Sequence, residues 1–352
     1  MRTLICERCL IPSSYPGINF DDQQICTLCQ NYSERVLFGE AALKDKLGSK
    51  DGDRYDAIIG ISGGKDSCYV AYYAKQILNL RVLAVCYDFP FMVDLARDNI
   101  KRVCKSLDID FVRIETKRNL EYRLLRNHLT SLAATGTTWG QCLFCHYGID
   151  AVLYNVAVKE RIPFILSGIT QNELWNPGSR MRFLTNRVKR LDWKETLRFV
   201  YYQTRAYAGL LDQRFQFPLP DNPPFAAYSK IKTPQEGPET VYFFNYVHWD
   251  GSAIEEILRR KTSWTKPDRA TSWRYDCILE PLLDYTYKRE FGISTVGLYL
   301  SNQIRAGLIS REEAMIIQQQ SESADQLRRD VERVFDFLKI PERTRSRFFD
   351  AA

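Results

Sequence analysis

The chain has 352 residues, of which 45% are hydrophobic and 26% are charged. These ordinary globular values exclude disorder, collagen and a coiled coil for the chain as a whole, and the length suggests two or three domains. Lys and Arg exceed Asp and Glu by 49 to 43, a net charge of +6 that suits an anionic substrate such as a nucleotide without requiring nucleic acid. No apolar run reaches the about 18 residues that cross a bilayer, and the N-terminus lacks a secretory apolar segment. We therefore expect a cytoplasmic protein with no membrane span.

A regular alternation of strands and helices predicts the architecture of the first half of the chain. Short β-rich apolar runs are followed by stretches with apolar residues at helical spacing. Strands that alternate with helices of about 10–15 residues indicate an α/β fold with a parallel, doubly wound sheet and helices on both faces. The expected helices cover 40–47, 66–77, 92–107 and 147–162, and the expected strands cover 55–61, 80–89, 110–116 and 163–169.

Changes in composition divide the chain into four units. A small cysteine-bearing module precedes the α/β domain. A basic, aromatic and proline-rich stretch follows, which is typical of a long loop or a substrate-facing insertion, and its basic part is either a solvated face or a groove for a sugar nucleotide or RNA. The last unit contains an expected strand over 241–249 and a helical C-terminal region, in which Ser310 and Glu313 stand at capping-box spacing. The four units cover 1–35, 36–175, 176–240 and 241–352.

The run SGGKDS, residues 62–67, carries the first chemical signal. It follows an expected strand and opens an expected helix, so its backbone N–H groups and the helix N-terminus can face an anion. Its two glycines permit a positive φ and the close approach of a phosphate, its two serines offer hydroxyl groups, and Lys65 adds a positive charge. The spacing is too short for the GxxxxGK[ST] loop.

Ten cysteines are many for a chain with no export signal, and clustered cysteines then indicate metal ligands or redox chemistry. Cys6 and Cys9 form one CxxC pair, and Cys26 and Cys29 form a second, at the spacing of a treble-clef or zinc-ribbon-like module. Four thiolates can close a tetrahedral zinc site, and a unit of about 30 residues would need the metal in order to fold. Because no coordination position would be open, we expect the Zn²⁺ to be structural.

Three further cysteines leave their chemistry open. Cys142 and Cys145 form a third CxxC pair just before an expected helix, and Cys277 is the best distant candidate for a third ligand. Three thiolates with one open position would suit a [4Fe–4S] cluster. A redox pair, small buried hydrophobic residues and a loop clip are the alternatives. The remaining cysteines fall within expected helices and strands and are expected in the core: Cys68, Cys86 and Cys104.

The run SGGKDS resembles the SGGxDS pyrophosphate loop of the PP-loop ATPases, the adenine nucleotide α-hydrolases. The resemblance implies a PP-loop (HUP-like) fold and cleavage of ATP between its α and β phosphates. A substrate oxygen would be adenylylated, pyrophosphate would leave, and a nucleophile would displace AMP. The resemblance makes Lys65 and Asp66 catalytic, with Asp66 helping to hold Mg²⁺. The implied ATP-binding residues are Ser62, Gly63, Gly64, Lys65, Asp66, Ser67, Asp88, Gly168, Asn172 and Glu173.

Other runs resemble the N-acetyl sugar amidotransferases of surface-polysaccharide (lipopolysaccharide) biosynthesis. The resemblance implies that ATP adenylylates the amide oxygen of a nucleotide-linked N-acetyl sugar and that ammonia replaces AMP. Glutaminase and ammonia-channelling partner proteins of the HisH and HisF type would supply the ammonia, because free ammonia is mostly protonated near neutral pH. The stretch 180–239 departs most from this family and leaves the substrate open. The matching runs are CERCLIPSSYPGINFDDQQICTLCQNY, YDAIIGISGGKDS, IPFILSGITQNE, YVHWD, YDC…LLDYTYKREFG and SNQIRAGLISREEAM.

Two other functions stay open. An ATP-dependent sulfurtransferase that thiolates a nucleobase or tRNA would use the same adenylylation, with sulfur from an iron–sulfur cluster or a persulfide. It would account for Cys142, Cys145 and Cys277, and the CxxC pair followed by a helix resembles that of tRNA-thiolating PP-loop enzymes, although the arginine that usually follows the pair is absent. RNA is a partner only in this case. A nucleotide-binding regulatory subunit is the third reading, and the full set of donors in SGGKDS argues against it.

Overall fold

The computed structural model describes most of the chain outside the expected insertion. The described segments are 3–34, 36–48, 54–115, 142–170, 237–266, 276–321 and 324–350, with isolated helical residues between 122 and 130 and between 193 and 201. Asn172 and Glu173 lie outside the described residues, as does nearly all of the stretch 176–240. Among the described residues, no helix combines the length and apolarity needed to cross a membrane.

A five-stranded parallel sheet forms the centre of the described structure, in the order β3-β2-β1-β4-β5. The first three strands run outward from β1 on one side, and β4 and β5 lie on its other side. The sequence prediction of a parallel sheet is confirmed, and the strand order reverses between β1 and β4. The strands cover Ala57–Gly60 (β1), Val82–Asp88 (β2), Asp110–Glu115 (β3), Phe164–Ser167 (β4) and Glu239–Tyr242 (β5).

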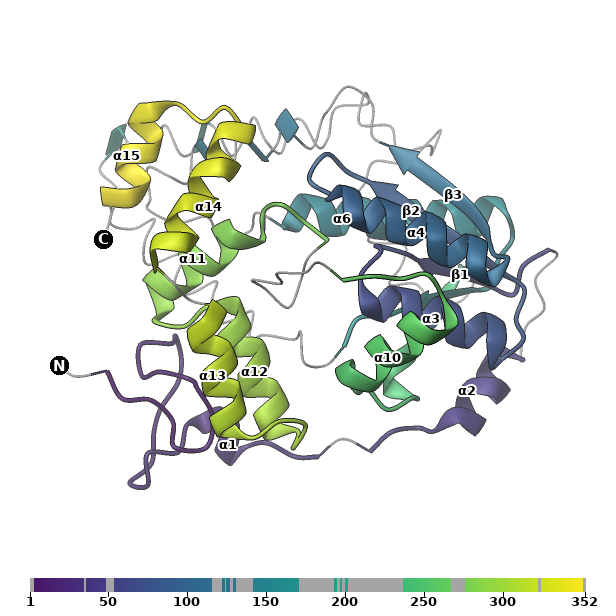
Figure 1. Cartoon of the computed structure of the whole chain (residues 1–352), viewed down its shortest axis with the longest axis horizontal. Coiled ribbons are helices and arrows are strands. Elements are labelled where there is room, and N and C mark those ends of the chain that lie inside the picture. The colour runs from purple at the N-terminus through teal and green to yellow at the C-terminus, as the bar shows by residue number, and fades with distance from the viewer. Residues whose placement is uncertain are drawn as a thin grey trace.

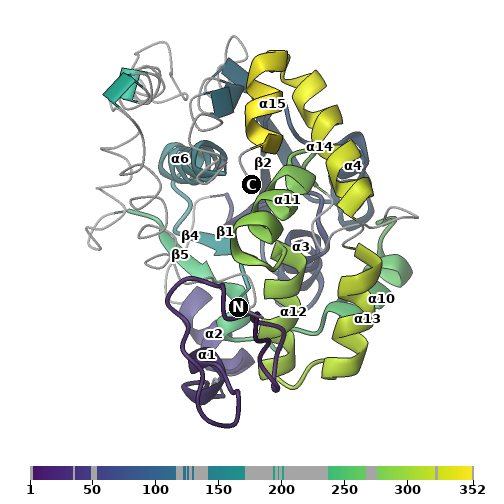
Figure 2. The same cartoon turned by 90° about the vertical axis from the view of Figure 1, so that its left-hand side faces the viewer.

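Helices cover both faces of this sheet, as the alternating pattern predicted (Figures 1 and 2). The helices α3 (Lys65–Gln76) and α4 (Asp94–Leu107) lie on one face, and α6 (Leu143–Lys159) lies on the other. This placement follows from the right-handed crossovers that parallel strands require, because the direction of winding changes when the chain returns from β3 to β4. The fold is therefore doubly wound.

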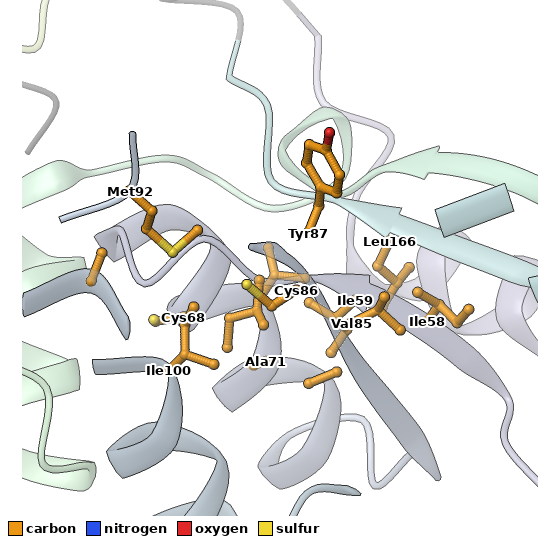
Figure 3. Close-up of a cluster of buried hydrophobic side chains, with 14 of the residues drawn as sticks. Ile58, Ile59, Cys68, Ala71, Val85, Cys86, Tyr87, Met92, Ile100 and Leu166 are labelled. Carbon is orange, nitrogen blue, oxygen red and sulfur yellow. The ribbon is translucent and has the colours of Figure 1, made fainter. Parts of the chain in front are cut away.

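The core between the sheet and its helices is made of aliphatic side chains and buried cysteines (Figure 3). Ile58 and Ile59 of β1 are completely buried, and each such side chain contributes about 1.5–3 kcal/mol through its transfer from water. The prediction that Cys68, Cys86 and Cys104 are core residues is confirmed, because all three are buried.

The C-terminal part is helical, as expected, and the N-terminal module packs against it (Figure 1). The expected capping box is present: the Ser310 hydroxyl accepts a bond from the Glu313 backbone N–H at 3.1 Å, and the Glu313 carboxylate accepts one from the Ser310 N–H at 3.0 Å. The helices cover Gly251–Lys261 (α10), Glu280–Phe291 (α11), Thr295–Arg305 (α12), Arg311–Ser321 (α13), Ala324–Phe337 (α14) and Glu342–Asp350 (α15), and the shorter N-terminal ones cover Thr27–Gln30 (α1) and Glu40–Leu47 (α2).

The strand expected over 241–249 is shorter than predicted. Strand β5 ends at Tyr242, and a 3₁₀ turn follows over Phe243–Asn245. Phe243 and Phe244 are both buried, although adjacent side chains of a strand point to opposite faces. The turn allows both rings to pack near the aromatic rings of α3, with Phe243 5.1 Å from Tyr73 between ring centroids. Aromatic packing therefore decides the local backbone here.

Candidate functional site

The run Ser62–Ser67 lies where the winding of the sheet reverses. It connects the carboxyl end of β1 to the first turn of α3, beside the boundary between β1 and β4. In open parallel sheets, ligands bind in the crevice at this point, outside the carboxyl ends of the strands. The N-terminus of α3 adds unpaired backbone N–H groups and the positive end of the helix dipole. The position suits an anionic ligand.

The backbone conformation at position 63 requires glycine, whereas the conformation at position 64 does not. Gly63 has φ of +82°, and a Cβ atom there would lie 2.2 Å from the carbonyl oxygen of Ala96. Gly64 has φ of −69° and precedes the helix in an extended conformation. Of the two glycines that could adopt a positive φ, only Gly63 does so. The Gly63 carbonyl accepts hydrogen bonds from the Trp264 indole N–H at 3.0 Å and from the Asn99 amide at 3.3 Å.

The two serines of the loop hold its ends together. Ser67 accepts a hydrogen bond from the Ser62 backbone N–H at 3.1 Å, and the two hydroxyl oxygens lie 3.2 Å apart. The Ser67 hydroxyl also donates to the Gly64 carbonyl at 3.2 Å. These bonds fix the turn in shape before any ligand arrives, which lowers the conformational entropy lost on binding.

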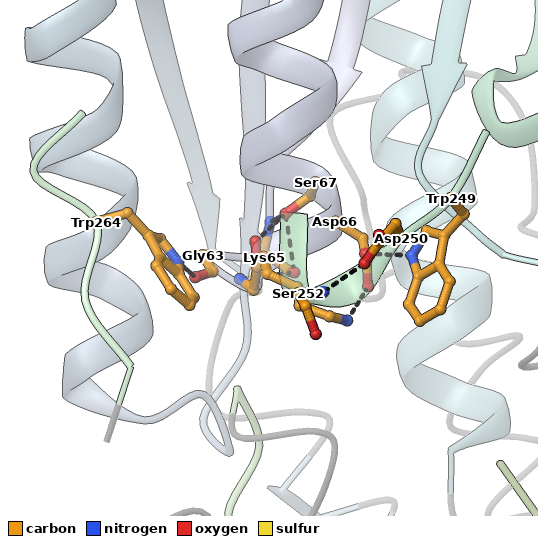
Figure 4. A network of polar contacts seen from close by, with 10 residues as sticks. Gly63, Lys65, Asp66, Ser67, Trp249, Asp250, Ser252 and Trp264 are labelled. Atoms are coloured by element: carbon orange, nitrogen blue, oxygen red, sulfur yellow. Dashed lines mark hydrogen bonds and ion pairs between the residues drawn. The ribbon is translucent and has the colours of Figure 1, made fainter. Parts of the chain in front are cut away.

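Lys65 and Asp66 form a largely buried ion pair against the indole of Trp249 (Figure 4). The Lys65 ammonium lies 2.7 Å from one carboxylate oxygen of Asp66, and the other carboxylate oxygen accepts a 2.7 Å hydrogen bond from the Trp249 indole N–H. The ammonium also lies 5.1 Å from the centroid of the Trp249 ring, within cation–π distance. Three residues from two distant segments thus form one network beside the loop.

The structure brings one further predicted residue to the loop and holds another nearby in ion pairs. A Cβ atom on Gly168, after β4, would lie 3.3 Å from the backbone of Asp66, so this strand end touches the loop. Asp88 lies at the carboxyl end of β2, and its carboxylate is 3.0 Å from the Arg97 guanidinium and 3.3 Å from that of Arg113. Both are at the edge of the sheet that carries the loop.

Asp276 is a residue of this site that the sequence analysis missed. Its Oδ2 atom lies 3.9 Å from the position of a Cβ on Gly64, and its backbone carbonyl accepts a hydrogen bond from the Val93 N–H at 3.1 Å. Among the described residues, its Oδ1 atom is one of the few buried side-chain oxygens with no hydrogen-bond partner. Both Asp276 and Trp249 lie in runs, YDC and YVHWD, that the sequence analysis used only to indicate a family.

The three cysteines of the expected cluster site are near one another. Cys142 precedes α6 and Cys145 lies in its first turn, while Cys277 pairs with Met92 in an isolated antiparallel bridge. Burial is the main cause that raises the pKa of the Cys277 thiol well above its ordinary value, and the charges of Cys145 and Cys142 add to it. The three sulfurs do not meet the spacing at which all donors would bind a single ion.

The four N-terminal cysteines form a site that fits one tetrahedral metal ion. Their sulfur atoms lie within 4.8 Å of one another and all four residues are buried. The Cys6–Cys29 and Cys9–Cys26 sulfur pairs are 3.9 Å and 3.7 Å apart, close to the edge of a tetrahedron with metal–sulfur bonds of about 2.3 Å. Hydrogen bonds from the Cys29 and Cys9 side chains lower the pKa of the Cys26 thiol, which favours its thiolate form. The donor set suits Zn²⁺.

An arginine of the C-terminal region lies beside these four cysteines. The Arg305 guanidinium, at the end of α12, lies 3.3 Å from the Cys9 sulfur and 3.9 Å from the Cys29 sulfur. Arg311 donates to the backbone carbonyls of Cys9 and Cys6 at 3.4 Å and 3.3 Å. Because four thiolates around Zn²⁺ carry a net charge of about −2, a buried guanidinium beside them reduces the cost of burying that charge.

Two family models match separate parts of the chain. Residues 39–132 match NAD synthase, and residues 267–352 match the C-terminal domain of the LPS biosynthesis protein WbpG-like family. The chain combines a PP-loop domain of the NAD synthase type with a WbpG-like C-terminal domain. The PP-loop domain marks an ATP-utilising enzyme, and the resemblance to polysaccharide-pathway proteins is confirmed at this level. The two matched segments meet at the loop, because Asp276 belongs to the second and Ser62–Ser67 to the first.

The individual relatives are distant. An uncharacterized protein of Methanocaldococcus jannaschii is 27% identical over 114 residues, which cover 32% of this chain and 39% of that protein. The match therefore spans about two-fifths of the length of this curated relative.

Three solved structures show weak similarity to between about half and nine-tenths of the chain. The NH3-dependent NAD synthetase from Campylobacter jejuni, in complex with the nitrate ion, has a TM-score of 0.30 and 13% identity over 52% of this chain and 95% of that chain. The NMN synthetase from Francisella tularensis has a TM-score of 0.33 and 14% identity, and the match covers 88% of this chain and 96% of that chain. The U34-tRNA thiolase NcsA from Methanococcus maripaludis, with its [4Fe-4S] cluster, has a TM-score of 0.31 and 17% identity, and the match covers 88% of this chain and 87% of that chain.

Proposed function

We propose that the chain is an ATP-dependent amidotransferase that converts the acetamido group of an N-acetyl sugar, carried on a nucleotide, into an acetamidino group. ATP and Mg²⁺ would bind at Ser62–Ser67, and a glutaminase partner would deliver ammonia. The observation that supports this most is the presence on one chain of an NAD synthase-type domain and a lipopolysaccharide-biosynthesis domain that meet at one loop. The first domain supplies ATP chemistry, and the second indicates a sugar as the acceptor.

The reaction would proceed in two displacements. The amide oxygen attacks the α-phosphorus, a P–O bond forms, and the bond from that phosphorus to the oxygen bridging to the β-phosphate breaks, which releases pyrophosphate. Ammonia then attacks the activated carbon, and the C–O bond breaks, so that AMP leaves with the former amide oxygen. Adenylylation is needed because an amide oxygen is a poor leaving group and AMP is a good one.

The described residues fit this division of work. In this proposal the N-terminus of α3 and the Lys65 ammonium would stabilise the negative charge that grows on the departing pyrophosphate, because fixed donors aimed at developing charge stabilise a transition state. Gly168 lets the end of β4 approach the loop closely. The proposal places the sugar nucleotide against the stretch 176–240, which differs most from the related family, and ATP also near Asp88, Asn172 and Glu173.

An isotope experiment tests the proposal. The chain is incubated with ATP, ammonium chloride and UDP-N-acetylglucosamine or a related sugar nucleotide that carries ¹⁸O in the acetyl carbonyl. We expect AMP to gain one ¹⁸O atom, seen as a mass increase of about 2 Da, and the sugar to gain one nitrogen from ¹⁵N-ammonium. The Lys65→Ala and Asp66→Ala variants should form no AMP while their circular dichroism spectra match that of the unchanged chain.

Two results would contradict the proposal. AMP that forms without ¹⁸O would mean that water attacks ATP and that no acceptor oxygen is adenylylated. A Lys65→Ala variant with full turnover would remove the proposed role of the loop.

A second candidate function, ATP-dependent thiolation of a nucleobase or tRNA, is favoured by one observation. The charges of Cys142 and Cys145 both act on Cys277, so the three thiols share one neighbourhood. Three thiolates could hold a [4Fe–4S] cluster with one iron open to sulfide. Anaerobic purification separates the two functions: a brown protein whose visible absorbance is lost on Cys142→Ala supports thiolation, whereas a colourless protein that contains zinc alone supports amidation.

A further inference from the structure

We propose that Asp276 supplies the carboxylate that binds the Mg²⁺ of incoming Mg·ATP at the N-terminus of α3. This inference rests on the proposed binding of ATP at Ser62–Ser67 and adds a residue from the WbpG-like domain to that site. The Oδ1 atom of Asp276 is buried and has no hydrogen-bond partner among the described residues, although buried carboxylate oxygens are normally hydrogen-bonded or paired.

The position of Asp276 is fixed by the backbone on both sides. The Asp276 carbonyl accepts a hydrogen bond from the Val93 N–H at 3.1 Å, and the Ile278 N–H donates to the Phe91 carbonyl at 2.9 Å. Cys277 between them pairs with Met92. This short segment therefore lies along the chain that leaves β2, and the Asp276 carboxylate is held beside Gly64 at the start of α3. Backbone hydrogen bonds on both sides therefore fix the position of the Asp276 main chain.

Among the described residues, no salt bridge to Asp276 accompanies the ion pair of the loop. Of the loop's own charged side chains, Lys65 is already paired with Asp66 at 2.7 Å, and the second oxygen of Asp66 accepts from Trp249. Asp276 and Asp66 both lie close enough to the buried Cys68 thiol that, after burial itself, their charges add to the rise in its pKa. Asp276 thus contributes a negative charge that the Lys65–Asp66 pair does not balance.

Two anions at one helix N-terminus require a cation between them. The triphosphate of ATP would be drawn to the N–H groups of α3, and the Asp276 carboxylate already stands there. At separations of a few ångströms in a partly buried site, their repulsion would oppose binding. Mg²⁺ removes this conflict, because it prefers oxygen ligands and is usually held by one or two carboxylates together with substrate phosphates.

Asp66 is a weaker candidate for the same role. Both of its carboxylate oxygens are engaged, one by the Lys65 ammonium and one by the Trp249 indole. A cation that bound Asp66 would have to compete with a buried ammonium 2.7 Å away. The expectation that Asp66 helps to hold Mg²⁺ can still apply after Lys65 turns to the phosphates, but Asp276 needs no such rearrangement.

The Mg²⁺ dependence of nucleotide binding tests the inference. Binding of α,β-methylene-ATP, which cannot be cleaved between the α and β phosphates, is measured by calorimetry with Mg²⁺ and with EDTA. We expect Mg²⁺ to tighten binding to the unchanged chain about tenfold or more. In Asp276→Asn this gain should disappear, while binding in EDTA should be equal or tighter because one negative charge is gone. Asp94→Asn is the matched control. It removes the same charge from the residue that follows Val93, whose N–H binds the Asp276 carbonyl, but the Asp94 side chain is 97% exposed.

The outcomes separate the inference from the proposed function. If the unchanged chain binds Mg·α,β-methylene-ATP and Asp276→Asn keeps the full Mg²⁺ gain, Asp276 is not the ligand and the inference is wrong, although ATP use stands. The same holds if Asp276→Asn only lowers the unfolding temperature, which would assign it a structural role. If neither protein binds the nucleotide with or without Mg²⁺, both the inference and the proposed function fail.

Discussion

The indole N–H of Trp249 donates a 2.7 Å hydrogen bond to the carboxylate of Asp66, across 183 positions of sequence. This bond joins the start of α10 to the first turn of α3, and Trp264 reaches the same loop by its bond to the Gly63 carbonyl. The segment between β5 and the WbpG-like domain therefore holds the Ser62–Ser67 loop in place from outside the strand–turn–helix unit. The loop depends on this part of the chain for its geometry.

The Trp249–Asp66 bond should matter for turnover. Trp249→Phe removes the donor and keeps an aromatic ring, although a smaller one, and a hydrogen bond to a charged acceptor contributes about 1.5–3 kcal/mol. We expect the rate of pyrophosphate release to fall about tenfold or more. If the two residues act through their bond, combining Trp249→Phe with Asp66→Ala should lower the unfolding temperature no more than Asp66→Ala alone does. Fully additive losses would contradict a shared role.

The two glycines of the loop should respond oppositely to the same substitution. Gly63→Ala adds a Cβ to a residue with φ of +82° and directs it at the Ala96 carbonyl, so the loop and α4 cannot both keep their positions. The left-handed backbone alone costs about 1–2 kcal/mol, and the clash adds to this. At Gly64, φ is −69° and the nearest atom to a new Cβ is the Ser62 hydroxyl oxygen at 3.4 Å, so Gly64→Ala should fold normally. Thermal unfolding of both variants checks the prediction, and equal unfolding temperatures would contradict it.

The buried thiols of the sheet and α4 should be chemically inert. Burial raises the pKa of Cys86 and of Cys104 from 9.0 to about 12 each. At pH 8 only roughly one thiol in 10⁴ would be the reactive thiolate, so iodoacetamide should leave both unmodified in the folded protein and label both in denaturant. Mass spectrometry of the peptides measures this, and rapid labelling of either in the native state would be inconsistent with the core.

The same two thiols give a pH dependence of stability with a definite sign. Their pKa values are higher in the folded chain than in the unfolded chain, so the folded state retains protons that the unfolded state has lost. Their contribution is complete below about pH 9 and is lost as the pH rises toward about 12. Cys86→Ala should therefore lose less stability over this window than the unchanged chain does, as measured by urea unfolding.

Local signals predicted much of the fold, and contacts between distant segments account for what they missed. The helix over 40–47, the loop at 62–67 and the capping box of Ser310 and Glu313 each depend on neighbouring residues, and all were predicted. The end of β5 at Tyr242 depends on aromatic rings of α3, which no pattern within the strand reveals. Asp276 lies more than 200 residues after the loop that it contacts, so only the fold shows that the two meet.

The contact between Arg305 and two cysteine sulfurs makes the N-terminal module and α12 depend on each other. Zinc analysis of the purified chain should find about one ion held by the four cysteines, and Cys26→Ser should abolish it. Arg305→Met keeps the length and the packing of the side chain but removes the charge that lies 3.3 Å from the Cys9 sulfur. Loss of such an outer partner typically lowers metal affinity about 10- to 100-fold, and competition with a chromophoric chelator would measure that fall. Arg305→Lys keeps the charge but cannot reach both sulfurs in the same way, so its zinc affinity should lie between those of the unchanged chain and Arg305→Met. Equal zinc affinity in all three proteins would mean that Arg305 only packs the module against α12 and does not stabilise the metal.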